Sequence, residues 1–196
     1  MLEQRIQQQF FDSADLQYAA AEVLSKPIAD AVSALVGCIT GGGKVLACGN
    51  GGSAADSQHF AAEIVGRFER ERPGMPAIAL TTDTSAITAI ANDYSYDVVF
   101  SKQVESLGRA DDFLLGISTS GNSRSIVEAI RAAQARDMRV IALTGRDGGA
   151  MGKMLRDGDF HLNVAHQRTM RVQEVHLLCI HSLCEVIDNV IHGERK

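Results

Sequence analysis

The sequence predicts an α/β fold: a doubly wound, mostly parallel five-stranded sheet of the flavodoxin-like kind. Short apolar segments alternate along the chain with segments whose apolar residues recur at helical spacing, which is typical of a parallel sheet with helices on both faces. Three of the apolar segments end in turns rich in glycine or hydroxyl residues, at 49–53, 81–85 and 118–123. Ligands of this fold class bind outside the carboxyl ends of the strands, so we expect these turns to face one pocket.

The composition indicates one domain with an ample apolar core. The chain has 196 residues, of which 45% are hydrophobic, with a net charge of −5 and a pI near 5.6. This acidic balance disfavours direct nucleic-acid binding and binding to an anionic membrane surface. The sequence shows no signal-peptide pattern and no apolar run approaching the ~20 residues of a transmembrane helix, so we expect a cytoplasmic protein without membrane contact.

The four cysteines lie in apolar surroundings and form no C-x-x-C pair. Such cysteines are typical of reduced core thiols in a cytoplasmic protein. They are Cys38, Cys48, Cys179 and Cys184.

Two helices are predicted before the first strand, over about 3–24 and about 26–39. Pro27 suits the first turn of the second helix. These helices have no sheet of their own to cover, so they could wrap the sheet edge or pack on another subunit. We expect the second, because aromatic side chains such as Phe10 are costly to leave in water. The predicted division is a single domain, 1–196, with an N-terminal oligomerisation segment at 1–40 and an α/β core at 44–192.

The first strand, Lys44–Cys48, runs into the turn Gly49–Ser53, and a helix is predicted from Ala54 to about Arg70. A glycine-rich turn between a buried strand and a helix lets a ligand approach the backbone closely. The turn lacks the G-x-G-x-x-G spacing with an acidic residue about 20 positions on, so a dinucleotide site is rejected. A plain glycine turn without a ligand remains the alternative.

His59 and Glu63 lie within this helix at positions i and i+4. Residues at that spacing share a helix face, so the imidazole and the carboxylate can converge on one point and form half of a metal site. The alternative is a surface pair without metal, which is common on helices.

The middle of the chain continues the alternation of strands and helices. A short strand at 77–80 is followed by a helix that opens at 81–85 and ends near Asn92 and Asp93. A further helix is expected within 94–107. The elements predicted after the turn at 118–123 are a helix at 124–136, a strand at 139–143, a short helix at 151–155, an edge strand at 159–164 and a long helix at about 169–192.

The segment 113–123 predicts a strand, a tight turn and the start of a helix. Unpaired backbone N–H groups and the helix dipole make such a start suitable for a phosphate held by amides and hydroxyls. A plain N-cap needs only one serine, whereas four hydroxyl residues gather here within six positions, which favours the anion site. They are Ser118, Thr119, Ser120 and Ser123.

The apolar run of the last helix is interrupted by His176 and His181. A lone histidine on a buried face is more often a hydrogen-bonded core residue than a ligand. With His59 and Glu63 elsewhere in the chain, a zinc site is the competing interpretation. Periodicity alone pairs Glu174 with His181, because seven residues return to nearly the same helix face.

Seven motifs are spread along the chain: Cys48-Gly-Asn-Gly-Gly-Ser53, His59-Phe-Ala-Ala-Glu63, Arg67-Phe-Glu-Arg-Glu-Arg-Pro73, Thr88-Ala-Ile-Ala-Asn-Asp93, Gly116-Ile-Ser-Thr-Ser-Gly-Asn-Ser123, Ala142-Leu-Thr-Gly-Arg-Asp-Gly-Gly149, and Val172-Gln-Glu-Val-His176 followed by His181. As a set they resemble the bacterial phosphoheptose (sedoheptulose 7-phosphate) isomerases, which have the sugar-isomerase (SIS) fold. The resemblance covers nearly the whole chain. No single motif is specific, but together they are highly specific.

The resemblance implies one Zn²⁺ per subunit and a homotetramer with its sites at subunit interfaces. The implied zinc ligands are His59, Glu63, Gln173 and His181, which overrides the periodicity preference for Glu174. Gln173 and His181 are eight residues apart, or about 12 Å along a straight helix, so both reach one ion only at full stretch unless the helix starts near Gln173 or two subunits donate. The expected substrate contacts are Asn50, Gly51, Gly52, Ser53, Glu63, Asn92, Asp93, Gln173 and, around the phosphate, Ser118, Thr119, Ser120 and Ser123.

The implied activity converts D-sedoheptulose 7-phosphate to D-glycero-D-manno-heptose 7-phosphate, which feeds ADP-heptose and lipopolysaccharide core synthesis. A proton moves between C1 and C2 through an enediolate, which requires a base and an acid. We assign Glu63 as the catalytic base and His181 as its acid partner. One departure from some family members is Met170, which stands where they carry an aspartate.

One alternative is a non-catalytic tetrameric scaffold that binds the bacterial replication initiator. That relative shares the segments Phe68–Pro73 and Leu183–Asn189 but lacks the acid at position 63 and the imidazole at position 181. This chain has both, which favours the isomerase. A sugar-phosphate sensor that binds without reacting is a third interpretation.

Overall fold

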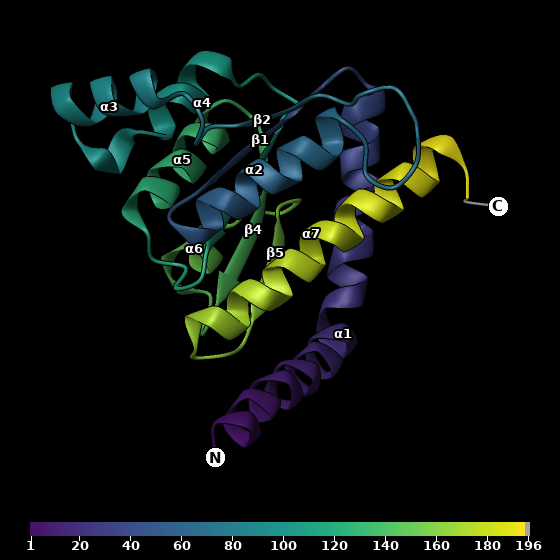
Figure 1. The fold of residues 1–196 in the computed structure, drawn as a ribbon. Helices are drawn as coiled ribbons and strands as arrows, with labels where there is room; N and C mark the ends of the chain where they lie inside the picture. The colour runs from purple at the N-terminus through teal and green to yellow at the C-terminus, as the bar shows by residue number, and fades with distance from the viewer. Residues whose placement is uncertain (195–196) are drawn as a thin grey trace.

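All five strands of the sheet are parallel, and their order is β2-β1-β3-β4-β5. This is the flavodoxin-like order of a doubly wound sheet, so the predicted fold class is confirmed. The structure is a computed structural model that describes residues 1–194 (Figure 1). The strands are β1 (Val45–Gly49), β2 (Ala77–Ala79), β3 (Phe113–Ser118), β4 (Arg139–Gly145) and β5 (Phe160–Val164), which lies at the sheet edge as predicted.

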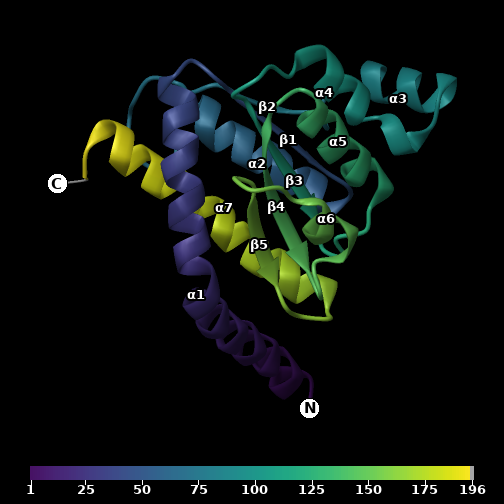
Figure 2. The same ribbon diagram turned by 180° about the vertical axis from the view of Figure 1, so that it is seen from behind.

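Helices cover both faces of the sheet (Figures 1 and 2). One layer consists of α1 (Leu2–Thr40), α2 (Gly52–Val65) and α7 (Thr169–His192). The other layer contains α4 (Ser101–Leu107), α5 (Arg124–Ala135) and α6 (Gly149–Met154). α3 (Thr84–Asp93) joins this second layer through the short 3-10 turn η1 (Tyr96–Val98), which packs on α5.

The sheet is apolar on both faces. Val45 and Ala47 belong to the apolar cluster with α1, α2 and α7, whereas Leu46 and Cys48 belong to the cluster with α4, α5 and α6. Successive side chains of a strand point to opposite faces, so a strand covered on both faces is apolar throughout. Because both faces are covered, a polar ligand can reach the sheet only at the strand ends.

The N-terminal prediction of two helices is wrong, because α1 is one continuous helix with Pro27 inside it. Proline lacks the N–H that would bond to the carbonyl of Val23, and the helix bends partway along its length (Figures 1 and 2). Buried residues lie on both sides of the proline, including Leu24 before it and Val32 after it. Their packing holds both halves in helical conformation at the cost of one hydrogen bond.

Two other helix boundaries differ from the prediction. α2 ends at Val65 and not near Arg70, because the last carbonyls of α2 accept hydrogen bonds from the side chain of Arg72. The helix expected within 94–107 is divided into η1 and α4. Across the break between η1 and α4, the Ser101 hydroxyl donates to the carbonyl of Val98 at 3.2 Å.

The prediction of reduced core thiols is confirmed. Cys38, Cys48, Cys179 and Cys184 are all free and buried. Burial raises the pKa of the Cys38 thiol to about 11 and that of Cys179 to about 12. Both thiols therefore stay protonated and unreactive at neutral pH.

Two helices, α1 and α7, are long and apolar enough to span a membrane by length and composition alone, which the sequence analysis did not anticipate. α7 nevertheless buries Arg171, His176 and Asp188 within the protein, and its apolar residues pack on the sheet. Side chains of these types are costly against lipid. α7 is therefore the core helix of its layer.

The outer surface of α1 carries large apolar side chains. Phe10 is 72% exposed and Tyr18 is 78% exposed, and Ile6, Phe11 and Val23 are also exposed. Apolar patches of this kind mark interaction surfaces. The oligomerisation role of the segment 1–40 stays a prediction.

Leu46→Ala should lower the free energy of unfolding by about 2–5 kcal/mol, because truncation leaves a cavity beside an internal strand. Leu46 is 0% exposed, whereas Leu107, at the end of α4, is 41% exposed. Leu107→Ala is therefore the matched control and should cost less than about 1 kcal/mol. Urea unfolding followed by circular dichroism measures both changes. Equal losses would contradict the tight packing described for β1.

Candidate active site

The carboxyl ends of β1 and β3 lie side by side, because Gly49 pairs with Ile117. From this edge the chain leaves β1 toward β2, while β3 lies on the other side of β1. Ligands of doubly wound sheets bind at such a switch point. Asn50 spans it, since its Nδ2 donates to Ser125 Oγ at 2.9 Å and its Oδ1 accepts from the Tyr96 hydroxyl at 2.8 Å. The turns after β1 and β3 therefore face each other, as predicted.

In the hydroxyl turn after β3, the serine side chains lie close to one another. Ser118 is buried, and its Oγ lies 3.0 Å from Ser123 Oγ and 3.4 Å from Ser120 Oγ. Ser123 stands at the N-cap of α5, but within the described chain its side chain makes no capping hydrogen bond. The plain N-cap interpretation is therefore weakened. Grouped hydroxyls beside open N–H groups of a helix start suit a phosphate.

Close backbone contacts hold this turn in place. Gly121 has a φ of +65°, and a Cβ there would lie 2.1 Å from the carbonyl oxygen of Gly148. The N–H of Met151 donates to the carbonyl of Gly121 at 2.9 Å, and the N–H of Ala150 donates to Asn122 Oδ1 at 2.9 Å. The loop after β4 thus packs directly against the hydroxyl turn, and only glycine permits that approach.

His59 and Glu63 of α2 meet His181 of α7 within one protomer. His59 Nε2 lies 3.2 Å from Glu63 Oε1 and 3.3 Å from His181 Nε2. Two donors bound at about 2.0–2.1 Å to one tetrahedral zinc are about 3.3–3.4 Å apart, so both separations fit edges of a zinc tetrahedron. Among residues 1–194, no three His, Cys, Asp or Glu side chains already form a complete metal-binding group.

The periodicity pairing of Glu174 with His181 is wrong. Glu174 turns toward α1, where its carboxylate accepts from Arg171 at 2.6 and 2.7 Å and from the Ser13 hydroxyl at 2.7 Å. Its neighbour Gln173 lies about 100° around the helix and points to the glycine turn after β1. A Cβ at Gly52 would lie 2.4 Å from Gln173 Nε2. Gln173 therefore lies against the same turn as the expected substrate contacts.

The third turn, at 81–85, is joined to the start of α2, since Thr81 Oγ1 donates to the carbonyl of Ala54 at 3.5 Å. The expected substrate contacts Asn92 and Asp93 lie at the exposed end of α3. Their recorded side-chain hydrogen bond joins them to each other at 2.8 Å. Among residues 1–194, no side-chain hydrogen bond joins them to the other predicted site residues.

Some neighbours of the site were missed by the sequence analysis. Tyr96 and Ser125 hold Asn50, and the Phe68 ring lies 5.8 Å from the His181 ring, centroid to centroid. Asp56 lies one turn before His59, and burial raises the pKa of its carboxyl while His59 partly offsets this effect. Phe68 stands in a quoted motif, but no sequence pattern connects these residues to one another.

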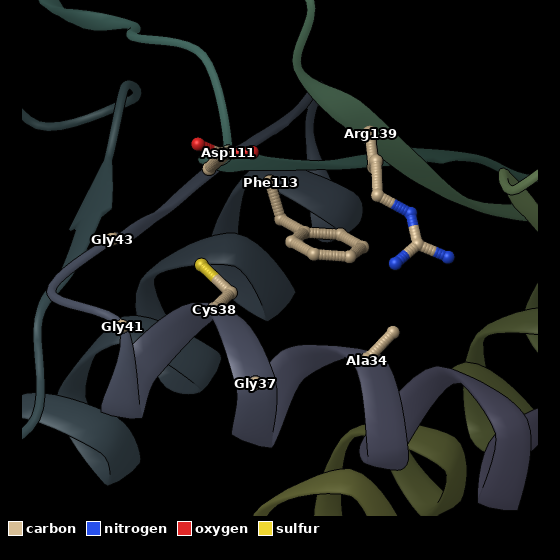
Figure 3. Close-up of a pocket in the computed structure, with 8 residues that line it drawn as sticks. All are labelled: Ala34, Gly37, Cys38, Gly41, Gly43, Asp111, Phe113 and Arg139. Atoms are coloured by element: carbon tan, nitrogen blue, oxygen red, sulfur yellow. The ribbon is translucent and has the colours of Figure 1, made fainter.

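A separate cavity of about 380 Å³ opens at the opposite edge of the sheet, where the strands begin (Figure 3). The Arg139 guanidinium lies there, 5.1 Å from the centroid of the Phe113 ring. Cys38 faces this space, but its raised pKa keeps it a neutral thiol and thus a poor metal ligand. The cavity therefore lacks the imidazole and carboxylate donors that meet at His59.

His176 adds a pH dependence to the fold. It is 0% exposed, its Nε2 donates to the carbonyl of Thr144 at 2.9 Å, and burial lowers its pKa to about 4 from the ordinary 6.5. Between these values the unfolded chain binds a proton that the folded protein does not. Stability that is full above about pH 6.5 should therefore fall, by on the order of 3 kcal/mol, as the pH drops toward 4.

The variant His176→Gln keeps an N–H donor but cannot be protonated. It should flatten the loss of stability between about pH 7 and about pH 4.5, measured by urea unfolding at each pH. A variant with the same pH slope as the wild type would show that His176 does not carry this dependence.

The SIS domain family model matches residues 9–145. The chain is 65% identical over 195 residues to the phosphoheptose isomerase of Methylibium petroleiphilum, covering 100% of this chain and 98% of the relative. It is similar to the solved structure of phosphoheptose isomerase from Neisseria gonorrhoeae (54% identity, 96% of this chain and 100% of that chain, TM-score 0.92). The structure from Francisella tularensis gives 43% identity, 96% and 99% coverage and a TM-score of 0.93. The chain therefore belongs to the phosphoheptose isomerase family of SIS-domain proteins.

Proposed function

We propose that this chain isomerises D-sedoheptulose 7-phosphate to D-glycero-D-manno-heptose 7-phosphate. The observation that carries the proposal is the meeting of His59 with Glu63 and His181, at 3.2 and 3.3 Å. These side chains belong to α2 and α7. Gln173 of α7 lies against Gly52 of the glycine turn, and Asn50 of the same turn donates to Ser125 of α5. Family membership at 65% identity to a phosphoheptose isomerase supports the same activity.

One Zn²⁺ per subunit is part of the proposal. Imidazole nitrogens and carboxylate oxygens are the donors that zinc prefers, and their separations at His59 fit a tetrahedral ion. Gln173 is the fourth proposed ligand. When bound, the ion supplies Lewis-acid polarisation of the sugar carbonyl.

Glu63 acts as the base in this proposal. Its contact with His59 uses Oε1, which leaves Oε2 for the substrate. Glu63 removes a proton from C1 of the ketose, which gives an enediolate across C1 and C2, and returns a proton to C2. His181 moves the remaining proton from the oxygen on C1 to the oxygen on C2, so the aldose forms with its atoms in balance.

The turn after β3 holds the phosphate. Ser118, Ser120 and Ser123 offer hydroxyls, and Thr119 lies among them. The start of α5 adds backbone N–H groups and the positive end of its dipole. Holding the far end of the sugar orients C1 and C2 toward Glu63, and such positioning lowers the barrier to reaction. The proposed substrate contacts in the glycine turn after β1 are Asn50, Gly51, Gly52 and Ser53.

The assembly and setting belong to the proposal as well. The exposed aromatic residues of α1 support a homotetramer, in which another subunit brings Asn92 and Asp93 to a site at the interface. The buried, reduced thiols support a cytoplasmic location, where the product would feed ADP-heptose and lipopolysaccharide core synthesis. The scaffold alternative gains no specific support, since its relative lacks the acid and imidazole that meet at His59 here.

Glu63→Gln should lower kcat by at least about 10²-fold while the fold stays intact, because the amide cannot accept the proton. Glu105→Gln, on the exposed surface of α4, is the matched control and should be neutral. Conversion of sedoheptulose 7-phosphate measures both, and a chelator should abolish wild-type turnover until Zn²⁺ is restored. A Glu63→Gln enzyme with near-normal kcat would refute the assignment.

Gly121→Ala should raise the KM for the sugar phosphate about tenfold or more, equivalent to roughly 1.4 kcal/mol of binding or more, because the new Cβ displaces the phosphate turn. Gly42→Ala is the control: its φ is +87°, but within the described chain no heavy atom lies within 4 Å of the added Cβ. The left-handed backbone should cost each variant about 1 kcal/mol of stability, and Gly121→Ala should lose more because its Cβ also meets the Gly148 carbonyl. Equal KM values would contradict the role of the turn.

A further inference from the structure

The segment between α2 and β2 carries an arginine that binds the end of α2. Arg72 Nη2 donates to the carbonyl of Glu63 at 2.7 Å. Its Nη1 donates to the carbonyl of Ile64 at 2.8 Å and to that of Gly66 at 3.2 Å. The last carbonyls of a helix lack partners within the helix and carry the negative end of its dipole. A buried guanidinium therefore caps α2 at the residue that bears the proposed base.

The same guanidinium binds α7. Arg72 Nε lies 2.9 Å from Asp188 Oδ1, and the two side chains are only 1% and 4% exposed. Asp188 follows His181 by seven residues, so the two lie on nearly the same face of α7. Asp188 Oδ2 has no hydrogen-bond partner among the described residues. Arg72 is thus the main compensation for this buried charge.

Two further residues of the segment contact α7. Arg70 donates to the carbonyl of His192 at 2.8 Å and to that of Gly193 at the end of the helix. The Phe68 ring packs near the His181 ring. Every second residue of this stretch therefore contacts α7. We call Phe68, Arg70, Arg72 and Asp188 the arginine clasp.

We propose that the arginine clasp is a set of positioning residues that hold His59 and Glu63 of α2 against His181 of α7. The inference rests on the proposed zinc-dependent function and names what supports its metal site. The two helices are far apart in the sequence, yet a metal site requires its donor distances to be correct within about 0.2 Å. One guanidinium that binds both helices fixes their spacing close to the ligands.

Arginine suits this task because its planar fork donates in several fixed directions at once. Arg72 uses that property to bind three carbonyls of the α2 end and a carboxylate of α7. A lysine keeps the charge but offers a single ammonium, so it cannot hold both helices in the same geometry. A purely structural role would change stability alone, whereas a positioning role also changes the metal centre.

The test compares metal binding in full-length Arg72→Lys and Asp188→Asn with the wild type. Zinc affinity, measured by competition with a chromophoric chelator, should fall about 10–100-fold, the range for groups that orient metal ligands. The absorption spectrum of the cobalt(II)-loaded protein should also change, since it reports coordination geometry. For sedoheptulose 7-phosphate, kcat should fall more than KM changes, because the phosphate turn is held by β3 and β4.

Two matched controls lie at the opposite edge of the sheet. Arg139→Lys removes guanidinium bonds to the Gly158 carbonyl at 2.9 and 2.7 Å. Asp112→Asn alters a carboxylate whose side chain is 3% exposed, close to the 4% of Asp188, and that pairs with Lys44. Both controls should lower stability while leaving zinc affinity and the cobalt spectrum unchanged.

Each outcome decides the inference. Clasp variants with wild-type zinc affinity and cobalt spectrum would show that the segment only stabilises the fold. A wild type that binds zinc but does not isomerise would overturn the proposed function, while the affinity comparison still decides the clasp. A wild type that binds no divalent metal overturns both. If Arg72→Lys does not fold, Asp188→Asn and Arg70→Gln, which acts at the α7 end, decide the same question.

Discussion

The parallel pairing of β1 with β3 is the constraint on which the rest of the site depends. It brings the glycine turn and the hydroxyl turn to one edge of the sheet, although they are separated by more than 60 positions of the chain. The covalent continuation of each strand then fixes where α2 and α5 begin. His59 lies in the first of these helices, and the phosphate turn immediately precedes the second. Sheet register therefore sets the distance between the reacting end and the anionic end of a bound sugar.

The sequence predicted the strands and the doubly wound fold class well, because strands buried on both faces leave a strong apolar signal. It also identified His59 and Glu63, whose contact is local. It failed where tertiary contacts decide: Pro27 lies inside a helix because residues on both sides are buried. Glu174 and Gln173 are neighbours, and only the packing of α7 against α1 shows which of them faces the site. Arg72 stands in a quoted motif, but no sequence pattern reveals its role, since its partners are backbone carbonyls and a distant carboxylate.

The outer surface of α1 and the end of α3 are both left uncovered in a single protomer. Phe10 and Tyr18 are exposed on α1, and Asn92 and Asp93 are exposed at the end of α3, where their side chains hydrogen-bond to each other. An exposed aromatic surface is costly in water. α3 has no fully buried residue, although Ile87, Ile90 and Ala91 are partly buried against the core of its layer. Both features are explained at once if further copies of the chain cover α1 and bring a second α3 near the site.

The contacts of His59 themselves argue for a cation between the three side chains. An imidazole nitrogen has one position in the ring plane, which holds either a proton or a lone pair. If Nε2 of His59 carries a proton, it can donate well to Glu63 or to His181, but not to both. If it carries a lone pair, the carboxylate at 3.2 Å faces it without a proton between them. The zinc ion proposed above would meet all three electron-rich atoms together, whereas a single proton on His59 Nε2 pairs it with only one of the other two.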